Sequence, residues 1–80
     1  MNIVYVLVSQ KYPQRCYVGL TQDLERRMKE HNNGDSAYTK RYGPWALQVY
    51  TTFVDRKRAE QFETYLKSGS GFAFLKRRFL

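Results

Sequence analysis

Ile3-Val4-Tyr5-Val6-Leu7-Val8 is the stretch that decides the fold we expect for this chain. It combines β-branched, aromatic and aliphatic side chains, which is typical of a strand buried on both faces. The next residues, 9–14, include Pro13 and predict a turn. Arg15 to Leu20 predicts a second strand. Because the connection is short, the two strands are expected to form an antiparallel hairpin.

The middle of the chain predicts a helix followed by a third strand. Thr21 is a suitable N-cap, and Asp23 and Glu25 suit a first helical turn, because acidic groups stabilise helix N-termini. The helix is expected over residues 23–33 and to stop at Gly34. Residues 34–44 are polar and basic and are expected to form a loop. Residues 45–53 alternate apolar with other residues, which predicts a strand.

The C-terminal third predicts two more helices. Asp55 can cap a helix over residues 56–67, and the stretch Ser68-Gly69-Ser70-Gly71 should break it. Residues 72–79 are expected to form a short basic closing helix. The predicted fold class is α/β in the α+β sense: a small, three-stranded, mainly antiparallel sheet flanked by helices. The order is strand, strand, helix, strand, helix, helix.

The composition favours a partner that carries many negative charges. The chain has 80 residues, enough for one domain with a modest core. It has 14 Lys and Arg against 7 Asp and Glu, a net charge of +7. Such a surface suits nucleic acid, because neutralising phosphates releases counterions; a solubilising surface is the alternative. The single cysteine, Cys16, cannot form an internal disulfide, and no signal peptide or membrane span is visible, so we expect a cytoplasmic protein without membrane partners.

Two polar side chains of the first predicted helix point toward the expected core. At about 100° per residue, Arg27 and His31 share the stripe of Leu24, whereas Arg26 falls on the far side. Arg27 and His31 are one turn apart and can act on one target. An inward arginine needs an anionic ligand or an internal carboxylate, because a buried unpaired charge is costly. Both interpretations stay open at this point.

The second predicted helix repeats this inconsistency. Glu63 lies inside the apolar stripe of Ala59 and Leu66, whereas Glu60 points sideways. A carboxylate among core positions tends to mark a functional site. The alternative is structural, with Glu63 as the internal partner of Arg27.

Two strand tyrosines complete the set. Tyr5 shares a face with Ile3 and Leu7, and Tyr17 shares a face with Gly19. Gly19 leaves room for a group to approach the sheet beside Tyr17. An isolated strand tyrosine is usually an ordinary packing residue, so the pair becomes informative only together with the helical residues.

Together these residues resemble the GIY-YIG nuclease family. Ile3-Val4-Tyr5 and Tyr17-Val18-Gly19 stand where the family has its two motifs, with Ile3 in place of glycine. The resemblance covers almost the whole chain and implies one nuclease domain over residues 1–80. The chain looks like the small stand-alone bacterial members. More distantly it is similar to the nuclease domain of the excision-repair subunit UvrC and to certain homing endonucleases.

The resemblance also implies roles for individual residues. The catalytic arginine of the family falls on Arg27, its frequent histidine on His31, and its metal-binding glutamate on Glu63. The implied reaction is hydrolysis of a DNA phosphodiester with a single Mg²⁺ or Mn²⁺, in DNA repair or recombination. A tyrosine, Tyr17 by preference, would activate the attacking water while Tyr5 orients it. The general base could also be Tyr5 or His31.

The implied substrate needs positive side chains that hold phosphates without reading sequence. The candidates for these phosphate contacts are Lys40, Arg41, Lys67, Lys76, Arg77 and Arg78. Gly19, which has no side chain, is a further candidate for DNA binding. RNA is an alternative substrate, and a protein partner or a homodimer could supply specificity. The competing functions are a catalytically inactive nucleic-acid-binding module of the same fold and a protein-interaction module.

Overall fold

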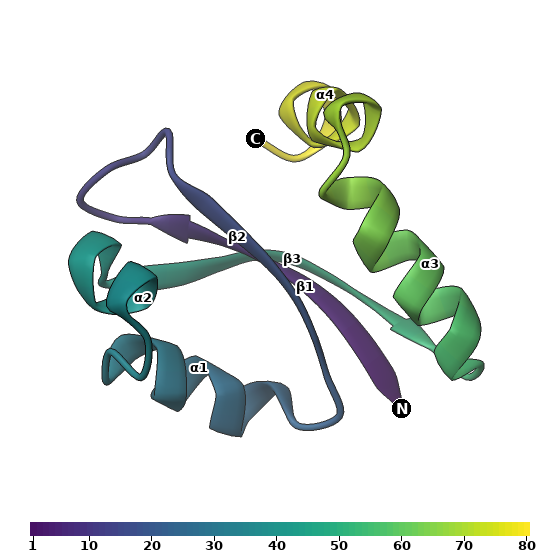
Figure 1. The fold of residues 1–80 in the computed structure, drawn as a ribbon, viewed down its shortest axis with the longest axis horizontal. Helices are drawn as coiled ribbons and strands as arrows, with labels where there is room; N and C mark the ends of the chain where they lie inside the picture. Colours follow the sequence, from purple (N-terminus) through teal and green to yellow (C-terminus); the bar gives the residue numbers. More distant parts are fainter.

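The computed structural model describes residues 1–80 as a three-stranded antiparallel sheet with helices on both of its faces (Figure 1). This confirms the predicted fold class. The elements in chain order are β1 (Asn2–Ser9), β2 (Cys16–Thr21), α1 (Leu24–Asn32), α2 (Ala37–Tyr42), β3 (Trp45–Phe53), α3 (Arg56–Leu66) and α4 (Gly69–Arg78).

β1 is the central strand of the sheet. The strand order is β2-β1-β3, and both pairings are antiparallel. Central placement explains the continuous apolar run of β1, because its side chains are covered from both faces. Tyr5 lies opposite Gly19 of β2 and Tyr50 of β3. β2 pairs only with β1, so one of its edges is open.

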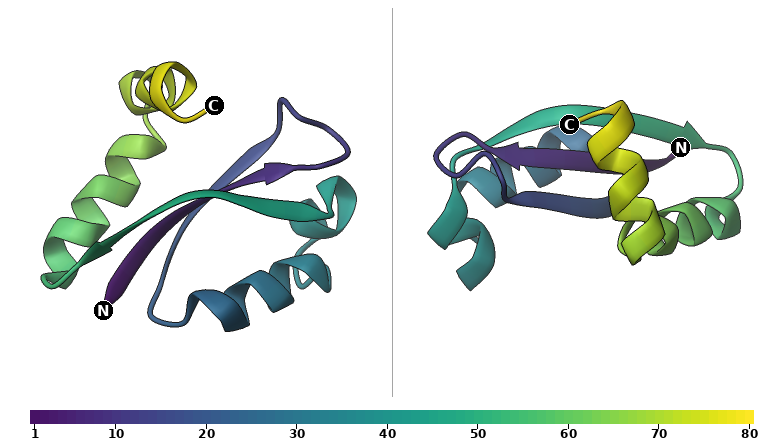
Figure 2. Two further views of the ribbon diagram at one scale, coloured as in Figure 1. Left: turned by 180° about the vertical axis from the view of Figure 1, so that it is seen from behind. Right: turned by 90° about the horizontal axis from the view of Figure 1, so that it is seen from above.

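The two faces of the sheet carry separate cores. On one face Val4 and Val6 pack with Ala59, Leu66 and Leu75 of α3 and α4. On the other face Tyr5, Leu7 and Trp45 form the buried centre, with side chains of α1 and α2 packed around them. The ribbon views show the two helical pairs on opposite sides of the strands (Figures 1 and 2). Helices α1 and α3 are therefore separated by the sheet.

The N-cap residue of α1 is not the one that was predicted. Asp23, not Thr21, is the N-cap, and its carboxylate accepts a hydrogen bond from the Arg26 amide. The Thr21 hydroxyl instead accepts from the Asp23 amide, which shapes the turn before the helix. At the other end, the Asn32 side chain accepts from the Trp45 amide at 2.7 Å and fixes α1 to β3.

The prediction of a loop over residues 34–44 was wrong, because these residues contain the short helix α2. Ser36 caps this helix reciprocally with Thr39, so a threonine does what glutamate does in the usual capping box. The Trp45 indole donates to the Thr39 carbonyl at 3.0 Å. Gly34, with φ of +74°, lets the chain turn from α1 into α2. Tertiary contacts thus hold a helix that is too short to be stable alone.

Helices α3 and α4 meet at a sharp corner. Asp55 caps α3 as predicted, with its carboxylate accepting from the Lys57 amide. Ser68 caps α4, so the serine–glycine stretch forms the first turn of that helix as well as ending α3. A Cβ on Gly71 would lie 1.7 Å from the Tyr65 carbonyl oxygen, so only glycine allows this approach. None of the helices is long and apolar enough to cross a membrane.

Candidate active site

The candidate site is built around the contact between Tyr5 and Gly19 on neighbouring strands. A Cβ on Gly19 would lie 2.4 Å from Cζ and Oη of Tyr5. The phenol ring therefore lies across β2 and carries its hydroxyl from the central strand toward the open edge of the sheet. The room that Gly19 leaves is thus filled by Tyr5, and a contact of Gly19 with DNA stays a prediction.

His31 joins the two tyrosines from α1. Its Nε2 atom and the Tyr5 hydroxyl are 2.8 Å apart in a buried hydrogen bond. The His31 ring centroid lies 4.5 Å from that of Tyr17, and the Tyr17 ring lies 6.2 Å from that of Tyr5. Tyr5 and His31 are 1% and 3% exposed, whereas Tyr17 is only half-buried. Of the two phenols, Tyr17 is therefore the one that a solvent molecule reaches more easily.

Burial fixes the protonation of this pair near neutral pH. Burial raises the pKa of Tyr5; the Arg27 guanidinium opposes the rise, while Tyr17 and Glu63 add to it. Burial and the charge of Arg27 lower the pKa of His31. Hence Tyr5 keeps its proton and His31 is neutral at pH 7. A neutral imidazole with its proton on Nδ1 accepts a hydrogen bond from the Tyr5 hydroxyl at Nε2.

Arg27 lies beside the pair and is held by a neighbour on its own helix. Its guanidinium donates to Glu30 at 2.7 Å, and this hydrogen bond raises the pKa of Arg27. The Arg27 side chain is 32% exposed against 70% for Arg26, as the helical face predicted. The alternative in which Glu63 is the internal partner of Arg27 was wrong, because that partner is Glu30. Glu30 was missed, although its spacing of three residues from Arg27 is a known helical pairing distance.

Glu63 approaches the same edge from the opposite face of the sheet. Its side chain is 23% exposed, whereas that of Glu60 is 53% exposed. It forms an ion pair with Lys67 at 3.2 Å. It is also close enough to Tyr5 for its charge to raise the pKa of that phenol. The open edge of β2 is therefore where residues of α1 and α3 come together.

The donor set suits a hydrated divalent ion better than a dedicated metal cage. No group of three or more His, Cys, Asp or Glu side chains is placed to hold a metal. Mg²⁺ usually keeps several waters and needs only one or two carboxylates together with substrate phosphate. A single half-buried carboxylate, Glu63, fits this requirement. Lys67 would have to move aside or share the carboxylate.

The predicted phosphate-binding residues lie in three places. Lys40 and Arg41 are in the last turn of α2, and Lys76, Arg77 and Arg78 are in the last turn of α4. All are exposed. Lys67 lies at the Glu63 carboxylate. The structure therefore brings Lys67 to the site and leaves the other five basic residues on outer surfaces.

Comparison with known proteins adds to this geometry. The sequence model of the GIY-YIG catalytic domain matches residues 1–76. A UPF0213 protein of Clostridium perfringens is 40% identical over 68 residues, which cover 84% of this chain and 71% of that protein. The solution NMR structure of a UPF0213 protein from Bacillus halodurans matches with a TM-score of 0.57 and 31% identity. It covers 96% of this chain and 84% of that one.

Larger relatives carry a more informative name. A structure-specific endonuclease subunit SLX1 homolog of Giardia intestinalis is 37% identical over 70 residues. Its counterpart in Candida dubliniensis, a structure-specific endonuclease subunit SLX1, is 39% identical over 71 residues. The matched regions cover 76% and 80% of this chain but only 20% and 25% of those proteins.

Proposed function

The chain belongs to the GIY-YIG family, and we propose that it is a divalent-metal-dependent endonuclease that hydrolyses DNA phosphodiester bonds. The observation that carries the proposal is the meeting of two opposite sets of groups at the open edge of β2. Tyr5, Tyr17, His31 and Arg27 come from one face, and the Glu63 carboxylate comes from the other. A phosphate bound between them meets a cation, hydroxyl groups and a metal ligand together.

Glu63 would hold the Mg²⁺ or Mn²⁺ ion. When bound, such an ion stabilises charge on phosphate oxygens and on the leaving oxygen. Of the two glutamates on α3, Glu63 has the less exposed side chain, at 23% against 53% for Glu60. It is close enough to Tyr5 for its charge to add to the rise that burial causes in the pKa of that phenol.

Arg27 would neutralise the charge that develops on the phosphate in the transition state. It is permanently charged at neutral pH, and Glu30 fixes one of its nitrogens. The remaining donors of the guanidinium are available to a phosphate oxygen. A donor placed before the reaction costs no reorganisation when the charge appears.

Tyr17 would activate the attacking water, because its hydroxyl is more accessible than that of Tyr5. A free tyrosine has a pKa near 10 and is a weak base at pH 7. The pair of Tyr5 and His31 would hold the pocket in shape and orient the water through the Tyr5 hydroxyl.

DNA is the proposed substrate, and the proposed role is in DNA repair or recombination; the SLX1 relatives are named as subunits of a structure-specific endonuclease. Because this chain spans about a fifth of the length of the Giardia relative, the activity and partners of the whole protein are a separate proposal. RNA is the alternative substrate. One site cuts one strand, so a double-strand cut would need a homodimer or a protein partner.

The test is a plasmid-nicking assay in Mg²⁺ and in Mn²⁺. Wild type should convert supercoiled to relaxed plasmid, and Glu63→Gln and Arg27→Ala should each lose roughly 10²–10³-fold in rate. The matched controls are Glu60→Gln and Arg26→Ala, which alter the exposed neighbours on the same helices. Nicking that persists in Glu63→Gln would overturn the metal assignment.

A second candidate is nucleic-acid binding without cleavage. It is favoured by the ion pair between Lys67 and Glu63, which occupies the carboxylate that a metal would need. It predicts salt-sensitive DNA binding but intact plasmid in every divalent metal. Lys67→Gln distinguishes the two candidates, since freeing the carboxylate should strengthen metal binding only if Glu63 is a metal ligand.

A further inference from the structure

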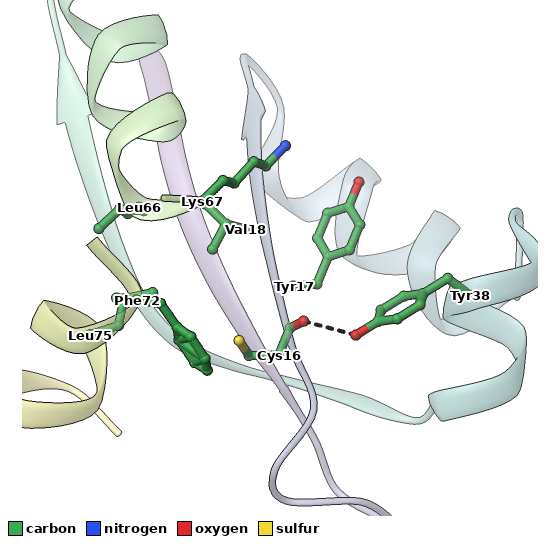
Figure 3. A pocket seen from close by; sticks show the side chains of 8 residues that line it. All are labelled: Cys16, Tyr17, Val18, Tyr38, Leu66, Lys67, Phe72 and Leu75. Carbon is green, nitrogen blue, oxygen red and sulfur yellow. Dashed lines mark hydrogen bonds between the residues drawn. The ribbon is translucent and has the colours of Figure 1, made fainter. Parts of the chain in front are cut away.

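An open apolar pocket lies along the free edge of β2, beside the candidate active site. Its volume is about 390 Å³. Val18, Leu66 and Leu75 are buried at its base. Figure 3 shows the rings of Phe72 and Tyr38 on opposite sides of Cys16. Pockets that hold small organic ligands measure roughly 300–1,000 Å³, so this one suits a single small, flat, apolar group.

We propose that this pocket binds one unstacked nucleobase of the DNA strand that is cut. The inference rests on the proposed function, because that function identifies the ligand as a DNA strand. It adds a binding site separate from the residues proposed to hydrolyse the phosphodiester. Three independent features of the pocket support it: its aromatic walls, its strand edge and its surrounding charge.

One of the aromatic walls, Tyr38, is held in place before any ligand arrives. The Tyr38 hydroxyl donates to the Cys16 carbonyl at 3.1 Å, and its ring stacks on Trp45 at 5.7 Å and 24°. Phe72 and Tyr38 are each 37% exposed, so ring surface remains available. Aromatic side chains stack on any base, because every base has a π-face.

The strand edge offers polar groups to the rim of a base. The Cys16 carbonyl accepts from Tyr38 on the side of β2 that faces away from β1. Alternate residues of a strand direct their backbone groups to the same side. Val18, two residues on, therefore presents its N–H and C=O to the pocket. A hydrocarbon ligand would leave these groups unpaired, whereas a base can hydrogen-bond with them.

Positive charges surround the apolar centre. Lys67 lines the pocket, and the Lys76 ammonium lies 5.8 Å from the centre of the Phe72 ring. The Arg15 guanidinium lies 4.6 Å from the centre of the Tyr42 ring, which in turn lies 5.0 Å from the ring of Tyr38. An apolar surface surrounded by cations suits a nucleotide, because its flat base can lie on the apolar surface while its phosphate lies near a cation. This charge also disfavours a competing ligand, a basic peptide strand added to the edge of β2.

The pocket is continuous with the candidate active site. Tyr17 and Lys67 line it, and Lys67 also pairs with Glu63. In Figure 3 the Lys67 ammonium and the Tyr17 hydroxyl both point toward the top of the view. A phosphate near Tyr17 would therefore have its neighbouring base at the pocket. In duplex DNA that base must first leave the stack, so a nucleotide that is already unpaired should bind at lower cost.

The test is metal-free binding, which does not need the chain to cut DNA. The probe is an abasic deoxyribose-phosphate oligomer with one 2-aminopurine, compared with the fully abasic oligomer of equal length. Wild type should bind the 2-aminopurine probe roughly 5- to 150-fold more tightly and quench its fluorescence. Phe72→Ala should remove this difference, and Phe72→Tyr should retain it.

Phe79→Ala is the matched control, since Phe79 is 38% exposed at the end of the same helix but does not line the pocket. Thermal melts of all variants establish that they are folded. Equal affinity of wild type for both probes would overturn the proposal, as would unchanged discrimination in folded Phe72→Ala. Tighter binding of the 2-aminopurine probe without plasmid nicking would support the nucleobase site and refute the proposed nuclease function. Plasmid nicking with equal affinity for both probes would support the nuclease function and refute the nucleobase site.

Discussion

Gly19→Ala should be among the most damaging small substitutions in this protein. The added Cβ would lie 2.4 Å from the Tyr5 ring, so the ring must shift by about 1 Å to regain an ordinary contact of 3.4 Å. That shift breaks the 2.8 Å hydrogen bond between Tyr5 and His31. Overpacking costs about 1–3 kcal/mol and the lost buried hydrogen bond about 1 kcal/mol more. We therefore expect a loss of about 2–4 kcal/mol in the free energy of unfolding.

The assay is urea unfolding together with thermal melting. For a domain of this size each kcal/mol lowers Tm by about 4–8 °C, so the midpoint should fall by at least ~8 °C. Gly69→Ala is the matched control, because no atom lies within 4 Å of its added Cβ. Neither glycine has a positive φ, so backbone strain contributes to neither variant. Gly69→Ala should be neutral or stabilising by up to about 1 kcal/mol.

A double-mutant cycle isolates the contact with Tyr5. In a Tyr5→Leu background the ring is gone, and Gly19→Ala should then cost less than about 1 kcal/mol. An equal cost of Gly19→Ala in both backgrounds would refute the argument, because the damage would then come from the strand and not from the ring. Cleavage by Gly19→Ala should also fall, since the Tyr5 hydroxyl no longer reaches its position.

Three further measurements test the site. Burial lowers the pKa of His31, so the folded protein favours the neutral imidazole. The free energy of unfolding should therefore be highest above about pH 6.5 and should decrease as the pH falls below that value. Urea unfolding of His31→Gln should not show this decrease. Glu30→Gln should free the Arg27 guanidinium and lower kcat roughly 10- to 100-fold with little change in KM, whereas the exposed Glu25→Gln should have no effect in the same nicking assay. If Arg77 contacts a phosphate of duplex DNA, Arg77→Ala should reduce the slope of log affinity against log salt by about 0.9, measured by fluorescence anisotropy.

The elements that the sequence predicted well are those with strong local signals. The third strand has the predicted bounds, Trp45–Phe53, because apolar and β-branched residues recur through the whole stretch. Helix α2 was missed because its six residues show no apolar period. Helix α2 is held by the hydrogen bond from the Trp45 indole to the Thr39 carbonyl and by a capping box that uses threonine. Neither feature is a standard helix signal in a sequence. The cap of α1 was misplaced by two residues because Thr21 and Asp23 are both good caps.

The orientation of the site residues was predictable, but their partners were not. Helical angles alone separated Arg27 from Arg26 and Glu63 from Glu60, and the exposed fractions agree. The same angles suggested that Arg27 and Glu63 could pair, because both point inward. They pair instead with neighbours three and four residues along their own helices. Pairing depends on which side of the sheet each helix packs, and a helical angle does not contain that information.

The arrangement at the sheet edge explains how residues from opposite faces can form one site. A side chain of a central strand normally stays above its own strand and meets only one face. Tyr5 crosses β2 because Gly19 has no side chain, which moves its hydroxyl outward by roughly one strand spacing of 4.8 Å. At that edge it can interact with His31 of α1 and with the charge of Glu63 on α3. Gly19 therefore acts mainly through the position of Tyr5, and this is why its substitution should affect stability and cleavage together.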